Sequence, residues 1–289
     1  MPIREITTIL RVTGPLRWPG MWNFSGNFQN EMLSWWFVVK ITLFVAGAIV
    51  ILGTVILTQT GRVPKISGAP MEGVSEEIPA SAEKVLDWSN WQRPEGPVRA
   101  GIQAGHWKVQ EVPEELQNLR NNTGSTGDGK REVDINLEIA NRIADILRAE
   151  GVETDVLPTT VPPGYLADVF VSIHADGSED LSKAGFKFAG PRRDFTGKRD
   201  LLTELLVKHY SLQTGLAQDP NVTRNMRGYY SFAWWRYEHA IHPMTPAAIA
   251  ETGFLSNRGD RKTIVDNPDI PARALADGIL EFLKTQKLL

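Results

Sequence analysis

The chain has no cysteine, little net charge and only one long apolar run, and each shortage limits what it can be. Without cysteine among its 289 residues, it has neither disulfide bonds nor thiolate ligands, so any metal ion must be held by His, Asp or Glu. Its 31 basic and 34 acidic residues give a net charge of −3, which argues against nucleic-acid binding. The sequence contains no internal repeat.

The one long apolar run lies near the N-terminus and predicts a membrane anchor. Residues 41–58 form 18 positions without a charge, and Trp35, Trp36 and Phe37 stand just before them. A helix needs about 20 apolar residues to cross a bilayer core, and aromatic side chains gather at the interfaces. We therefore expect one uncleaved transmembrane helix within 35–58. A buried core helix is the alternative interpretation of the same run.

Basic residues are more frequent before this run than shortly after it. They are Arg4, Arg11, Arg17 and Lys40 on one side, and Arg62 and Lys65 on the other. Because positive residues tend to stay in the cytoplasm, residues 1–34 are expected inside the cell and the C-terminal region outside, as in a single-pass protein of the cell membrane. Residues 59–96 are punctuated by Pro and Gly and carry several Glu, which predicts an extracytoplasmic linker.

From residue 97 onward, short apolar runs alternate with amphipathic segments. Strands are expected near 98–103, 152–157, 168–174, 185–189 and 247–251, and helices near 132–149, 201–212 and 271–288. Alternation of this kind implies a mostly parallel sheet with helices on both faces. Residues 97–289 are therefore predicted to form a single three-layer α/β domain with an open sheet around one core.

Three residues at the ends of these expected elements have the chemistry of metal ligands. His106 follows the first strand, Glu132 opens the long helix, and His174 ends a buried strand. Active sites of open α/β sheets gather at the carboxyl ends of the strands. Two His and one Glu are a ligand set of catalytic zinc, with a fourth position left for water. Taken singly, each residue also has a structural interpretation, as a packed histidine or as a charge that favours the helix dipole.

A fourth residue, Glu251, ends another apolar strand. A carboxylate beside zinc-bound water can take its proton and later pass it to a leaving amine. Amide hydrolysis needs the second transfer, because an amine leaves poorly without protonation. A buried, paired carboxylate is the structural alternative for Glu251.

Four segments in this order resemble the zinc-dependent N-acetylmuramoyl-L-alanine amidases. They are GIQAGH (101–106), REVDINLEIANRIADILRAEGVETDV (131–156), ADVFVSIHAD (167–176) and PAAIAETGFLSN (246–257). The resemblance covers residues 97–289 and implies His106, Glu132 and His174 as Zn²⁺ ligands and Glu251 as the catalytic glutamate. It also implies hydrolysis of the amide between N-acetylmuramic acid and L-alanine in peptidoglycan, with zinc-bound water as the nucleophile.

The sequence departs from the family pattern at three places. Trp107 and Lys108 follow the first histidine where the family usually has two glycines, residues 158–167 leave no room for a helix often found there, and Asp176 replaces the commoner Asn. Two alternatives therefore stay open: a zinc peptidase that cuts another cell-wall amide, and an inactive amidase-like domain that binds the wall or a partner. The expected partners are peptidoglycan and the membrane, and a protein activator is left open.

An aromatic-rich stretch before the last strand supplies further residues of interest. Core packing is the favoured interpretation of its aromatic side chains, and a sugar or peptide groove is the alternative: Tyr229, Tyr230, Phe232, Trp234 and Trp235. Arg224 and Arg227 have the chemistry to meet substrate carboxylates. The remaining histidines are expected in packing or at the surface and not as ligands: His209, His239 and His242.

Overall fold

The computed structural model describes residues 88–289. The expected membrane span 35–58, the segment 1–34 before it and most of the linker 59–96 lie outside the described residues, so anchor, orientation and linker stay predictions. Within the described part, no helix is long and apolar enough to cross a membrane. The described residues belong to one compact unit.

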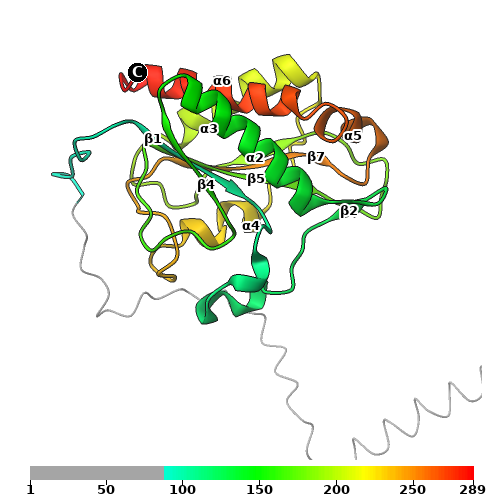
Figure 1. Cartoon of the computed structure of the whole chain (residues 1–289), viewed down its shortest axis with the longest axis horizontal. Helices are drawn as coiled ribbons and strands as arrows, with labels where there is room; N and C mark the ends of the chain where they lie inside the picture. The colour runs from blue at the N-terminus through cyan, green and yellow to red at the C-terminus, as the bar shows by residue number, and fades with distance from the viewer. Residues whose placement is uncertain (1–87) are drawn as a thin grey trace, which may run out of the picture. The chain divides into compact units, whose positions relative to one another are not determined.

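Five strands form one sheet whose spatial order differs from the chain order (Figure 1). The order is β4 (Glu153–Leu157), β1 (Arg99–Ala104), β5 (Val169–Asp176), β7 (Ala247–Phe254) and β6 (Lys187–Ala189). The first four strands pair in parallel, and β6 pairs antiparallel with β7 at the edge. This confirms the expected mostly parallel α/β sheet. Parallel strands place their carboxyl ends at one edge, where ligands bind in such sheets.

Three long helices cover one face of this sheet: α2 (Glu132–Ala149), α3 (Arg199–Thr214) and α6 (Asp269–Thr285). Helix α6 packs against both α2 and α3. The buried stripe of α2 recurs every fourth residue, at Ile135, Ile139, Ile143 and Leu147, which is the periodicity of an amphipathic helix. Helix α2 has the bounds expected from the sequence. The short helix α5 (Arg258–Ile264), which the sequence analysis missed, follows β7.

The other face of the sheet is covered mainly by loops. Its helical pieces are the short α4 (Arg224–Arg227) and the 3₁₀ helix η3 (Tyr230–Phe232). Phe170 and Ile249 of the sheet pack there against Phe232 in a second core cluster. The prediction of helices on both faces is therefore only partly correct. The physical reason is that β4 and β5 are joined without a helix, so within residues 88–289 no long helix crosses this face.

The segment between β1 and α2 adds small elements that the sequence patterns did not predict. They are η1 (Val109–Glu111), η2 (Glu114–Leu119), β2 (Thr126–Gly127) and β3 (Lys130–Arg131). Strands β2 and β3 form a two-stranded antiparallel sheet. Val109, Val112 and Leu116 form a small buried cluster within this segment, and Tyr230 and Tyr237 pack against it.

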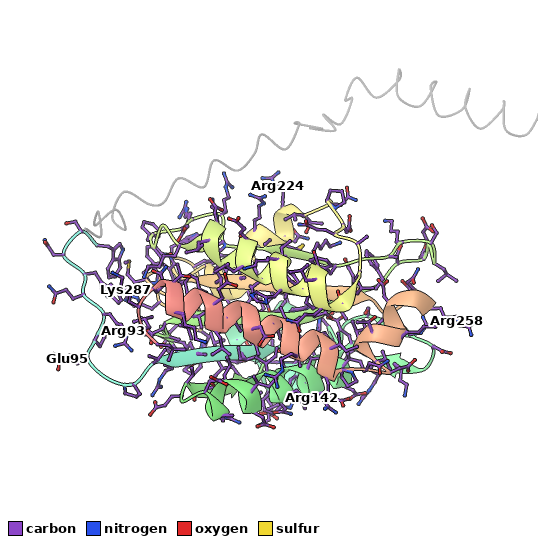
Figure 2. The ribbon with its side chains drawn as sticks, turned by 90° about the horizontal axis from the view of Figure 1, so that it is seen from above. Arg93, Glu95, Arg142, Arg224, Arg258 and Lys287 are labelled. Atoms are coloured by element: carbon purple, nitrogen blue, oxygen red, sulfur yellow. The ribbon has the colours of Figure 1, made fainter. Side chains whose placement is uncertain are left out.

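Residues before β1 pack onto the same domain. The guanidinium of Arg93 forms an ion pair with Asp168, with Nε and Oδ1 2.5 Å apart. The ring of Trp88 meets that of His242 edge-on, with centroids 5.0 Å apart. Arg93 and Glu95 lie at one end of the domain (Figure 2). The last residues of the expected linker are thus in contact with the domain.

Candidate active site

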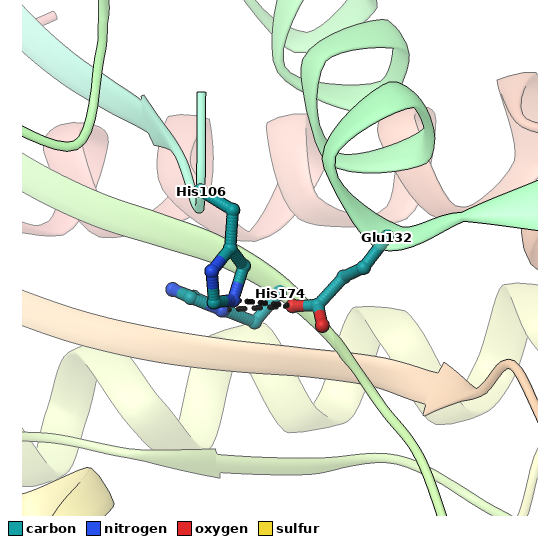
Figure 3. A group of neighbouring side chains, drawn as sticks. All are labelled: His106, Glu132 and His174. Carbon is teal, nitrogen blue, oxygen red and sulfur yellow. Dashed lines mark hydrogen bonds and ion pairs between the residues drawn. The ribbon is translucent and has the colours of Figure 1, made fainter. Parts of the chain in front are cut away.

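Three elements bring the expected metal ligands together at the carboxyl edge of the sheet (Figure 3). His106 lies just after β1, Glu132 is the first residue of α2, and His174 lies near the end of β5. One ligand atom from each lies within 4.8 Å of the other two. Side chains alternate along a strand, so Ile173 packs into the helix-covered core and His174 points to the loop-covered face.

Glu132 is the common hydrogen-bond acceptor of this cluster. Its Oε1 lies 3.2 Å from Nε2 of His106 and 3.0 Å from Nδ1 of His174. The backbone N–H of Ser125 donates to Oε2 at 2.6 Å, and that of Ala175 donates to Oε1 at 3.2 Å. Both carboxylate oxygens are therefore held by donors from separate parts of the chain, which fixes the side chain in one orientation.

The end of β1 approaches His174 so closely that only glycine fits. A Cβ added at Gly105 would lie 2.4 Å from Cε1 of His174, closer than real contacts allow. The buried side chain of Asn136 donates to the Gly105 carbonyl and to Oε1 of Glu132, at 3.2 Å each. Asn136 thereby ties the strand end to the helix that carries the carboxylate.

The electrostatics favour a negative Glu132 with positive charge facing it. Burial acts to raise the pKa of Glu132, but hydrogen bonds from His106 and His174 hold it well below its usual value. Burial acts to lower the pKa of His106, yet its bond to Glu132 raises it overall. Nδ1 of His106 lies 2.6 Å from the Asn122 carbonyl, which only accepts, so Nδ1 carries a proton and Nε2 faces Glu132.

These side chains fit a metal ion. The two imidazole nitrogens and the carboxylate oxygen converge from buried or half-buried positions. They match the three-protein-ligand sets of catalytic zinc sites. His106 also makes the hydrogen bond through its second nitrogen that orients metal-binding histidines. The cluster is therefore a candidate metal site.

Glu251 lies beside this cluster, paired with His174 across β5 and β7. Its side chain is half-buried, and its Oε2 is enclosed without a hydrogen-bond partner among the described residues. Burial, and after it the charges of Asp176 and Glu132, raise the pKa of Glu251 well above its usual value, with Lys187 acting in the opposite direction. A carboxyl group that holds a proton beside a ligand cluster is suited to proton transfer.

A cavity of about 440 Å³ opens next to the cluster. His106 and His174 line it together with Asn118 of η2, with Tyr229 just before η3 and with Tyr230 at the start of η3. The cavity lies on the loop-covered face, where the short connection between β4 and β5 leaves room for it.

The other residues that the sequence singled out divide between cavity, core and surface. Tyr229 and Tyr230 line the cavity and also pack against buried clusters, so their positions fit the packing and the groove interpretations alike. Phe232 is buried in the core, as the packing interpretation predicts. Arg224 and Arg227 are exposed on α4.

The tryptophans and the remaining histidines lie apart from the ligand cluster. Trp234 meets the exposed ring of Phe195, and Trp235 lies under the guanidinium of Arg193. His209 pairs with Glu281, His239 pairs with Glu115, and His242 packs against Trp88. In the structure the three histidines thus take part in packing and ion pairs.

Two buried polar residues behind the site were not predicted from the sequence. Gln103 lies in β1 and Asn136 in α2, and neither is exposed to solvent. Buried polar side chains are uncommon and need hydrogen-bond partners. A polar residue inside an apolar strand or helix stripe was therefore the available signal for both.

A family model described as N-acetylmuramoyl-L-alanine amidase, Amidase_3, matches residues 163–281. The matched region contains His174 and Glu251, whereas His106 and Glu132 precede it. No curated protein matches the chain.

Several solved structures are similar to this chain. The amidase AmiC2 of Nostoc punctiforme is 20% identical over 66% of this chain and 99% of its own, with a TM-score of 0.47. The catalytic domain of the amidase CwlV from Bacillus (Paenibacillus) polymyxa var. colistinus is 23% identical over 65% and 98%, with a TM-score of 0.46. The amidase Ami1 from Mycobacterium smegmatis is 16% identical over 65% and 98%, with a TM-score of 0.48.

The family match and the side-chain geometry are separate observations that agree. The match covers the segment from before β5 into α6, and the geometry adds two ligand-type side chains from β1 and α2 that meet His174. Together they identify the described domain as an N-acetylmuramoyl-L-alanine amidase catalytic domain, a hydrolase that acts on peptidoglycan.

Proposed function

We propose that His106, Glu132 and His174 hold a zinc ion, and that Glu251 transfers protons while the amide between N-acetylmuramic acid and L-alanine is hydrolysed. The convergence of the three ligand atoms within 4.8 Å carries this proposal. The cavity beside the two histidines gives a substrate amide access to the cluster. A bound zinc ion polarises a carbonyl and lowers the pKa of water to about 7.

In this proposal Glu251 serves both proton transfers of the reaction. As a carboxylate it takes a proton from the attacking water, whose oxygen forms the new bond to the amide carbon. It then gives that proton to the amide nitrogen as the carbon–nitrogen bond breaks, so the products are a lactyl carboxylate and the free amine of L-alanine. Its raised pKa suits a group that must hold the proton between these steps.

The test uses the full-length chain with purified peptidoglycan, with zinc and after chelation, and mass spectrometry of the products. We expect peptides with a free L-alanine amine only when zinc is present. Glu251→Gln should bind one equivalent of zinc yet cleave about 10²- to 10⁴-fold more slowly. Glu281→Gln, which changes a partly exposed glutamate on α6, is the matched control and should cleave normally.

Three outcomes would contradict the proposal in different ways. Normal cleavage by Glu251→Gln would remove the role given to Glu251. Shortened stem peptides in place of released ones would indicate a peptidase that cuts another cell-wall amide. Zinc binding by the wild type without any turnover would favour an inactive domain that binds the wall, or a requirement for an activator.

We also propose that residues 35–58 anchor the protein in the cell membrane, with residues 97–289 facing the wall. The charge-free run and the excess of basic residues before it support this orientation. Protease added outside intact, wall-stripped cells should release the amidase domain. Protection from that protease, together with full digestion after lysis, would contradict the orientation.

A further inference from the structure

Behind His174, buried polar side chains form a network that the proposed reaction does not use. The hydroxyl of Tyr229 lies 3.1 Å from Nε2 of His174 and 3.0 Å from Oε1 of Gln103. The hydroxyl of Ser172 donates to the hydroxyl oxygen of Tyr229 at 3.2 Å. Gln103 and Ser172 are wholly buried, so their polar atoms depend on one another for hydrogen bonds.

The backbone fixes which way the amide of Gln103 is turned. Its Nε2 lies 2.8 Å from the carbonyl of Thr159 and 3.2 Å from that of Pro158. A carbonyl only accepts, so the amide presents its NH₂ group there and its Oε1 to Tyr229. Tyr230 agrees with this direction: its hydroxyl donates to the Thr159 carbonyl at 2.5 Å and accepts from Nε2 of Gln103 at 3.0 Å.

The directions of these hydrogen bonds also decide which nitrogen of the His174 ring carries a proton. Tyr229 has one hydroxyl proton, and it is donated to Oε1 of Gln103 at 3.0 Å or to the hydroxyl of Tyr230 at 3.2 Å, both away from His174. The phenolic oxygen therefore accepts from Ser172 and from Nε2 of His174, so Nε2 carries a proton. Nδ1, on the other side of the ring and 3.0 Å from Glu132, is the nitrogen left to meet a cation.

We propose that Gln103 and Tyr229 are positioning residues that hold His174 in the tautomer that offers Nδ1 as the metal ligand. This inference rests on the proposed function, because it needs a metal at the cluster. The ring of Tyr229 also meets that of His174 edge-on, with centroids 5.5 Å apart, which restricts rotation of the imidazole. Mutation of residues that orient metal ligands in this way typically lowers metal affinity or activity by about 10- to 100-fold.

The first test is zinc affinity of the full-length chain, measured by competition with a chromophoric chelator. Tyr229→Phe removes only the hydroxyl and should weaken zinc binding about 10- to 100-fold. Gln103→Leu should also weaken zinc binding. The loss of zinc-binding free energy in the double variant should be smaller than the sum of the losses in the two single variants, because the two residues act through one chain of hydrogen bonds. Tyr165→Phe is the control: it removes a hydroxyl bonded to Asp155 at 2.7 Å on the same face, and should leave zinc affinity unchanged.

The second test needs no variant of the network. In the zinc-loaded wild type labelled with ¹⁵N-histidine, nitrogen NMR should show the proton of His174 on Nε2, the signal being assigned by its absence in His174→Gln. A proton on Nδ1 would overturn the inference even if Tyr229→Phe fails to fold. A wild type that binds no zinc would overturn this inference and the proposed function together. Zinc binding with unchanged affinity in Tyr229→Phe would overturn the inference alone.

Discussion

At the scale of single residues, Glu132 serves the fold and the site at once. As the first residue of α2 it has a backbone N–H that the helix cannot satisfy, and the carbonyl of Ser125 accepts it at 2.9 Å. Its negative charge favours the helix dipole. A buried carboxylate without a partner would be costly, so His106 and His174, or a cation between them, are needed to keep it there.

This arrangement gives the metal-free protein a defined pH dependence. The pKa of Glu132 is lowered, so its contribution to stability is present above its unfolded pKa of about 4.3 and is lost as the pH falls below that value. The pKa of His106 is raised, so its contribution is present below its unfolded pKa of about 6.5 and is lost as the pH rises through the folded value. The pair should therefore stabilise most between about pH 4.5 and 6.5.

With a chelator present to keep the protein metal-free, Glu132→Gln should lower the free energy of unfolding by on the order of 2 kcal/mol within this pH window. The reason is that the hydrogen bonds to a charged carboxylate are replaced by hydrogen bonds to a neutral amide. The difference from wild type should shrink on both sides of the window. Urea unfolding from about pH 3 to pH 8 measures it. A constant difference across this range would show that the charge of Glu132 is not what stabilises the cluster.

At the scale of elements, two departures from the amidase sequence pattern meet in space. The N–H of Thr159, in the short β4–β5 connection, donates to the carbonyl of Trp107 at 2.8 Å. Because a loop and not a helix joins these strands, the carbonyl of Thr159 is also free to reach Gln103, 2.8 Å away. The shortened connection thus supplies the fixed end of the network behind His174.

On the opposite face, α3 and α6 approach each other at Gly278. A Cβ there would lie 3.0 Å from Cα of Leu206, so a larger side chain must push the helices apart. Gly278→Ile should destabilise the protein by about 1–3 kcal/mol through overpacking, with unchanged zinc affinity because the cluster lies across the sheet. Chemical unfolding and a zinc titration measure the two quantities.

The control for this helix contact is the neighbouring residue. Asp277→Ala removes an exposed hydrogen bond from Gln213 at 2.9 Å and should change stability by no more than about 0.5 kcal/mol. A loss of zinc affinity in folded Gly278→Ile would show that helix packing reaches the metal ligands.

At the scale of the whole molecule, the amidase domain includes residues ahead of its first strand. Asp168 precedes β5, at the edge of the sheet opposite the cluster, and its side chain is 10% exposed. Besides Arg93, it accepts the backbone N–H of Arg99 at 2.8 Å. Without Arg93 this largely buried carboxylate would lose its charged partner, so the segment before β1 contributes to the stability of the fold.

Arg93→Ala should therefore lower the free energy of unfolding by about 1–3 kcal/mol, the range for hydrogen bonds to charged groups. Cleavage of peptidoglycan at a temperature where the protein is folded should not change. Arg142→Ala, which removes exposed ion pairs with Glu138 and Asp269, should cost at most about 1 kcal/mol. Equal losses in the two variants would contradict a structural role for the segment that holds Arg93.

Much of this protein could be predicted from its sequence because the signals are local. Helical spacing of apolar residues predicted α2 over 132–149, and β-branched runs predicted the parallel strands. The lack of cysteine restricted metal ligands to His, Asp and Glu, and the motifs around His106, Glu132 and His174 predicted residues that the structure brings together. The roles of zinc and Glu251 and the anchor over 35–58 stay predictions.

Only the tertiary structure decided how the site is supported. Gln103, Thr159 and Tyr229 lie far apart in the sequence, and no local pattern indicates that they share hydrogen bonds behind His174. The same holds for the ion pair of Arg93 with Asp168 and for the loop cover on one face of the sheet. The physical reason is that periodicity records whether a side chain is buried, whereas its partners depend on which distant segments the folded chain packs around it.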